Sequence, residues 1–65
     1  MQIDTTKIKI LIVSKGFNQK TLAEQMGMRT SNLSAVLSRG SCKAATACRI
    51  AEALGVEVTE IIIGR

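Results

Sequence analysis

The sequence predicts an all-α fold, a compact domain of five short helices. Two observations lead to this prediction. Apolar residues recur three and four positions apart along most of the chain, as they do on the buried face of a helix. Gly16, Gly27, Gly40 and Gly55 each close one of these stretches, at the position where a residue with positive φ ends a helix. The chain has 65 residues and no proline, and this length allows one domain at most, so we expect a single domain over residues 1–65.

The first helix is expected from Thr5 to Lys15, with Asp4 as its N-cap. The stretch 7–13 also alternates like a strand, but the glycine at 16 and the helical pattern that follows favour a helix. This helix carries more apolar surface than one buried face needs. One face holds Ile8, Leu11, Ile12 and Lys15, and the other holds Ile10 and Val13.

Three further helices are expected over Gln19–Met26, Thr30–Arg39 and Lys43–Leu54, with Asn18 as the cap of the first of them. A short fifth helix is expected after Thr59, including Ile61 and Ile62. The predicted inner faces of the three middle helices are apolar: Leu22, Ala23 and Met26; Leu33, Val36 and Leu37; Ala47, Ile50, Ala51 and Leu54.

The charge of the chain is unevenly distributed. Nine Lys and Arg and five Asp and Glu give a net charge of +4. Residues 1–51 hold eight basic and two acidic side chains, a net charge of +6, whereas residues 52–65 hold one basic and three acidic ones, a net charge of −2. A basic body suits a polyanionic partner. On charge alone, a basic domain without such a partner fits equally well.

Several classes of chemistry have no support in the sequence. The chain has no histidine, its five carboxylates are scattered, and it has no glycine-rich phosphate loop. Cys42 and Cys48 stand six positions apart, about 120° around a helix, so they make a poor metal site. We expect them in core packing or at a helix start. We therefore expect no enzymatic activity, no metal and no cofactor.

Targeting features are also missing from the sequence. No charged-then-apolar signal segment and no apolar run of membrane-spanning length is found. The expectation is a cytoplasmic protein with reduced thiols and no membrane association.

The segment from Gln19 to Val36 has the pattern of two helices that cross steeply. Ala23 is small enough for a close crossing, and Gly27 can take positive φ in a tight turn. Met28 and Leu33 would then fill the angle between the helices. This pattern predicts a helix-turn-helix over residues 19–39.

The pattern Q-x-x-L-A-x-x-x-G-x-x-x-x-x-L-x-x-V, which begins at Gln19, resembles the helix-turn-helix of the lambda/434 Cro and repressor superfamily. The stretch from Arg49 to Ile62 resembles the fourth and fifth helices of that Cro/C1-type family, and the likeness covers residues 5–63. It implies a lambda-repressor-like domain with the motif in its second and third helices. It also implies a sequence-specific regulator of transcription, in our interpretation a repressor, that binds double-stranded DNA.

The chain departs from this family at three places. Arg29 stands where the family often has a capping serine or threonine, so we expect Thr30 to cap the helix instead. Ile12 and Leu37 occupy the places of a frequent Arg–Glu pair, which predicts an apolar contact there. The spacing from Leu33 to Gly40 is one residue longer than in the best-known repressors, which leaves the path of residues 38–43 open.

The resemblance implies that the helix from 30 to 39 docks in the major groove with its N-terminus leading. With Leu33 turned inward, the helical period gives the base-facing candidates: Thr30, Ser31, Asn32, Ser34 and Ala35. The phosphate-contacting candidates border the same surface: Gln19, Lys20, Arg29, Ser38, Arg39, Ser41 and Lys43. The alternative is that these are solvated charges and the polar outside of an ordinary helix.

A homodimer on two half-sites is expected, because a single module of this size makes few phosphate contacts. The candidate interface residues are the surplus apolar ones, Ile10, Val13 and Ile63. The same surplus also fits a protein-interaction module on this fold, either an antitoxin that binds a toxin protein or an adaptor.

Overall fold

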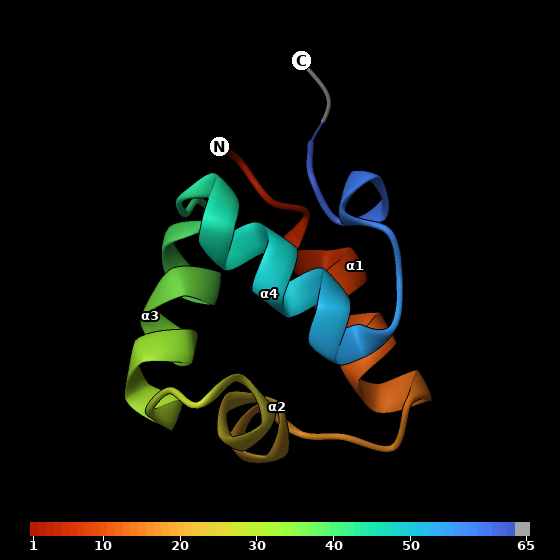
Figure 1. Cartoon of the computed structure of the whole chain (residues 1–65), viewed down its shortest axis with the longest axis vertical. Helices are drawn as coiled ribbons and strands as arrows, with labels where there is room; N and C mark the ends of the chain where they lie inside the picture. Colours follow the sequence, from red (N-terminus) through yellow and green to blue (C-terminus); the bar gives the residue numbers. More distant parts are fainter. Residues whose placement is uncertain (64–65) are drawn as a thin grey trace.

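The computed structural model describes residues 1–63 and consists of helices joined by short turns (Figure 1). It contains four α-helices and one 3₁₀ turn: α1 (Thr5–Ser14), α2 (Gln19–Met26), α3 (Thr30–Arg39), α4 (Ala44–Leu54) and η1 (Val58–Glu60). The predicted all-α class is therefore confirmed. The bounds of α2 and α3 are as predicted, whereas α1 ends one residue earlier and α4 begins one residue later than expected.

The predicted fifth helix is wrong. The 3₁₀ turn ends at Glu60, and its start is capped by a capping box in which the Glu57 N–H donates to the Glu60 carboxylate at 3.3 Å. Ile61 is then fully buried, and Ile62 pairs with Ile3 in an antiparallel bridge. The isoleucines after the turn therefore serve the core and an extended pairing rather than a helix.

The helix caps follow the sequence with one exception. The side chains of Asp4 and Asn18 accept hydrogen bonds from the main-chain N–H groups of residues 7 and 21, at 3.0 and 2.8 Å. At α3, however, Arg29 occupies the N-cap position with extended backbone and forms no side-chain cap, and Thr30 lies inside the helix. The expectation that Thr30 caps α3 was therefore wrong.

The core gathers the inner faces of all four α-helices. α2 packs against α3 and α4, and α4 packs against η1. All buried side chains within residues 1–63 are apolar: Ile3, Ile8, Ile12, Leu22, Ala23, Met26, Leu33, Val36, Leu37, Ala47, Ile50, Ala51, Leu54 and Ile61. The predicted inner faces are confirmed for α2, α3 and α4. On α1, Leu11 is only half-buried, and Lys15 is exposed at the C-cap position, so the predicted inner face was wrong for Lys15.

The N-terminal segment is extended and lies between the segment after α3 and the segment after η1, an arrangement that the sequence did not indicate. Gln2 bridges to Ser41 on one side and Ile3 bridges to Ile62 on the other, both antiparallel. The Ile3 N–H donates to the carbonyl of Gly40 at 3.0 Å, and the Asp4 N–H donates to the carbonyl of residue 61 at 2.7 Å. These pairings also define the path after α3: the helix ends at Gly40 with a φ of 75°, and the chain then turns alongside the N-terminus.

The two cysteines occupy different environments. Cys42 is half-buried against the core, whereas Cys48 is exposed on α4, so the expectation of core packing or a helix start was wrong for Cys48. Burial raises the pKa of the Cys42 thiol, and the positive charges of the N-terminal amine and Arg39 partly offset this effect. Residues 1–63 contain no group of three or more metal-ligating side chains and no helix with the length and apolarity to cross a membrane.

Candidate nucleic-acid interface

The junction between α2 and α3 is a tight turn centred on Gly27. This residue has a φ of 69°, as its position in the sequence predicted, and its N–H donates to the carbonyl of Glu24 at 3.1 Å. The Met28 N–H donates to the carbonyl of Ala23 at 3.0 Å. Leu33 is fully buried behind the turn and Met28 is half-buried beside it. The close crossing of α2 and α3 is therefore built as the motif predicted.

α3 has two sharply different faces. Its buried side is formed by Leu33, Val36 and Leu37. All five base-facing candidates are exposed on the other side, together with two of the phosphate-contacting candidates: Thr30, Ser31, Asn32, Ser34, Ala35, Ser38 and Arg39. In Figure 1 this helix lies along one side of the molecule, so its outer face is open to a large partner.

The remaining phosphate-contacting candidates lie at or near the N-terminal ends of three helices. Gln19 is half-buried as the first residue of α2, and Lys20 follows it, exposed. Arg29 and Lys43 are exposed at the N-cap positions of α3 and α4, and neither helix has a side-chain cap there. Ser41 is half-buried, and its backbone pairs with Gln2. Uncapped helix N-termini with basic neighbours favour an anionic partner.

The charged residues in the sequence around α3 have one sign. From residue 25 to residue 51 the sequence holds four basic residues and no acid: Arg29, Arg39, Lys43 and Arg49. This span contains the turn, all of α3 and most of α4. The turn and α3 therefore carry no acidic side chain that would repel a phosphate backbone, and the acid of α4, Glu52, lies in its last turn.

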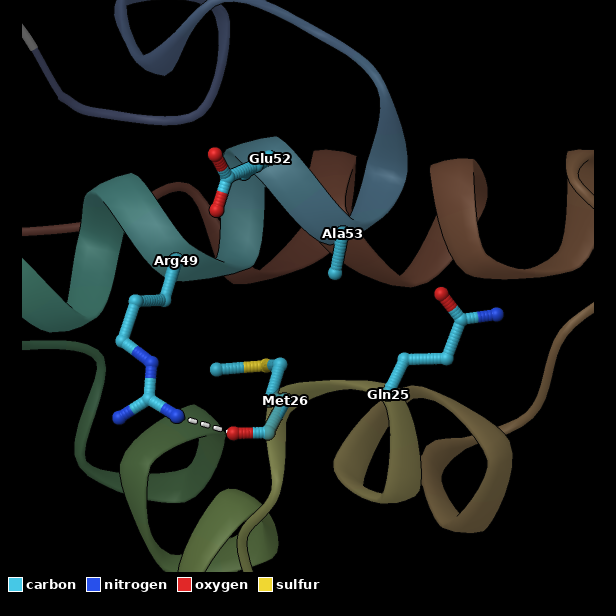
Figure 2. A pocket seen from close by; sticks show the side chains of 5 residues that line it. All are labelled: Gln25, Met26, Arg49, Glu52 and Ala53. Carbon is cyan, nitrogen blue, oxygen red and sulfur yellow. Dashed lines mark hydrogen bonds between the residues drawn. The ribbon is translucent and has the colours of Figure 1, made fainter.

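Sequence reasoning gave no role to Arg49. Its Nη2 atom donates to the main-chain carbonyl of Met26 at the end of α2 (Figure 2). The two residues line a cleft of about 350 Å³ together with Gln25, Glu52 and Ala53. Nothing in the sequence pattern indicated this contact, because it depends on how α4 packs against α2.

Comparison with known families agrees with this geometry. Residues 2–65 match the family model described as winged helix-turn-helix DNA-binding. The chain belongs to this winged helix-turn-helix family. DNA binding is therefore the role of this helix-turn-helix protein, which points to a binding function rather than a catalytic one. No curated protein and no solved structure matches it.

The wing in the family's description has no counterpart among residues 1–63 of this helix-turn-helix protein. Extended pairing there is limited to two isolated bridges, Gln2 with Ser41 and Ile3 with Ile62. These bridges join the N-terminal segment to the segment after α3 and to the segment after η1. Among residues 1–63, the exposed residues of the helix-turn-helix therefore lie on helices and turns rather than on a strand hairpin.

Proposed function

We propose that this helix-turn-helix protein is a sequence-specific regulator of the Cro/C1 type that binds double-stranded DNA and acts as a repressor. It places α3 in the major groove. The observation that carries the proposal is the outer face of α3, which is exposed, composed mostly of small polar side chains and free of acids. Repression needs only that the protein occupies its site on DNA.

The residues on this face can read base edges. The amide of Asn32 can bond an adenine at two points, and the hydroxyls of Thr30 and Ser31 can pair with several base edges. The methyl of Ala35 suits a thymine methyl. Because no long basic side chain occupies the middle of the helix, α3 must approach the bases closely, and DNA shape supplies part of the specificity.

The first experiment is selection of binding sites from a pool of random DNA duplexes at moderate salt. We expect enrichment of an inverted repeat whose half-sites lie one helical turn apart, about 34–36 Å. Binding without an enriched sequence would contradict sequence-specific reading. No retained DNA would favour the antitoxin or adaptor function.

Charge reversal tests the proposed phosphate contacts. The double variant Arg39→Glu with Lys43→Glu should bind the selected duplex much more weakly, because two exposed cations beside α3 are replaced by anions. The slope of log affinity against log salt should fall by about 0.9 for each lost phosphate contact. Lys15→Glu is the control, since this exposed residue lies at the end of α1, outside the proposed interface. An unchanged salt slope in the double variant would remove both residues from the interface.

The second candidate function is a protein-interaction module, an antitoxin or an adaptor. The observation that favours it is the exposure of large apolar side chains: Ile10 is 61% exposed, Val13 75% and Ile63 54%. If the protein is the proposed DNA-binding regulator, we assign these exposed apolar side chains to contact with a second copy of the chain. If it is an interaction module, the same side chains would contact a partner protein such as a toxin.

A further inference from the structure

A single side-chain hydrogen bond in the described residues joins distant parts of the chain. Arg49 on α4 donates to the carbonyl of Met26, which lies 23 positions earlier at the end of α2 (Figure 2). The other side-chain hydrogen bonds within residues 1–63 join residues three positions apart. Arg49 is therefore placed to hold the end of α2 against α4.

The carbonyl that Arg49 reaches is one that the turn itself leaves open. A helix ends with four carbonyls that have no partner within the helix. The N–H groups of Gly27 and Met28 satisfy the carbonyls of Ala23 and Glu24. The Met26 carbonyl receives the Arg49 guanidinium instead, and a cation near the C-terminal end of a helix also interacts favourably with the helix dipole.

The same contact lies at the start of the turn that leads into α3. Met26 precedes Gly27, and a Cβ placed on Gly27 would lie 3.9 Å from Arg49 Nη2. α3 begins at Thr30, four residues after Met26. We infer that Arg49 is a positioning residue for DNA reading: it holds the turn on α4 and thereby sets the angle at which α3 meets the groove. This inference rests on the proposed function and gives Arg49 no contact with DNA.

The test compares three variants on the selected duplex and on a random duplex over a range of salt concentrations. Arg49→Met keeps the aliphatic stem and removes the donors, whereas Arg49→Lys keeps the charge and one donor group. Lys15→Met is the matched control, because it removes one exposed positive charge at a site away from the turn. Thermal unfolding confirms that each variant is folded.

We expect Arg49→Met to weaken binding to the selected duplex by roughly tenfold, the scale of one charge-assisted hydrogen bond. Its salt slope and its affinity for random DNA should match those of Lys15→Met, and Arg49→Lys should restore part of the loss. A salt slope reduced by about 0.9 would instead make Arg49 a phosphate contact and overturn the inference. Equal affinities of Arg49→Met and Lys15→Met for the selected duplex would also overturn it.

Hydrogen exchange separates this inference from the proposed function. If the wild-type chain enriches no DNA sequence, the proposed function fails, but the clamp on the turn is still measurable. The amides of Gly27 and Met28 should then exchange faster in Arg49→Met than in Lys15→Met, while the buried amides of α4 exchange equally in both. Unchanged exchange at the turn would show that Arg49 does not hold it.

Discussion

Gly27 is the residue on which the shape of the turn depends most directly. Its φ of 69° belongs to the left-handed region, where a side chain brings Cβ close to the following carbonyl. A Cβ added there would meet its nearest neighbour, Arg49 Nη2, only at ordinary contact distance, so steric crowding adds nothing. Glycine is therefore favoured at this position because of its positive φ, and not because a side chain would lack space.

Gly27→Ala should lower the free energy of unfolding by about 1–2 kcal/mol, the cost of left-handed backbone with a Cβ. Urea denaturation measures this loss. Gly16→Ala is the control, because that glycine has a φ of 76° and open space around it but lies outside the motif. Both variants should lose similar stability, whereas only Gly27→Ala should also weaken sequence-specific DNA binding. An unchanged stability of Gly27→Ala would show that the turn does not need positive φ.

Single residues also show where sequence reasoning succeeds. The exposed and buried faces of α3 follow from Leu33 and the helical period, because each side chain's direction depends only on its neighbours along the chain. Arg49 could not be found in this way. Its partner is a main-chain carbonyl on another helix, and a main-chain carbonyl carries no residue-specific pattern.

Among the elements, the extended N-terminal segment had no counterpart in the prediction from sequence. α2 and α3 each carry an apolar repeat and end at a glycine, so their bounds could be placed to the residue. Residues 2 and 3 pair through isolated bridges with Ser41 and Ile62 instead. One bridged pair has no periodicity to recognise, and the partners lie far away along the chain. The same pairing removed Ile62 from the expected fifth helix.

Ile3 should contribute to stability as much as a residue in the middle of a helix. It is 2% exposed and lies in the core, so Ile3→Ala should lower the free energy of unfolding by about 2–5 kcal/mol. That is a large part of the total for a domain of this size, on the order of 3–10 kcal/mol. Gln2→Ala is the control, because this neighbour is exposed and pairs through its backbone. Equal urea midpoints for the two variants would show that the N-terminal segment is not part of the folded core.

For the whole molecule, size limits how two copies can associate. The chain exposes 4077 Å², and a stable interface covers about 800 Å² on each partner, close to one fifth of that surface. The groove that exposes Ile10 and Val13 is lined by only two further residues, Lys9 and Ser14. Each copy also carries a net charge of +4, which opposes association. A dimer proposed through this surface would therefore be weak, and binding to DNA would have to assist it.

The position of this groove leaves α3 free. α3 and the C-terminal half of α1 lie on opposite sides of the view in Figure 1. The molecule measures 29 × 21 × 18 Å, so two copies side by side on DNA are of a size to occupy half-sites one helical turn apart, about 34–36 Å. Adjacent half-sites would hold the copies at high local concentration, and the phosphates would neutralise their charge.

We therefore expect the protein to be largely monomeric at low micromolar concentration without DNA and to bind an inverted repeat cooperatively. The double variant Ile10→Ser with Val13→Ser should lose this cooperativity, so its affinity for the full site should fall by about tenfold. Its affinity for a single half-site should equal that of the wild type. Titration of full-site and half-site duplexes measures both quantities, with Ile63→Ser as the comparison because it alters a separate exposed isoleucine. If Ile63→Ser alone removes the cooperativity, the copies meet through the C-terminal segment instead. If the wild type binds the two half-sites independently, the exposed face of α1 serves a different protein partner.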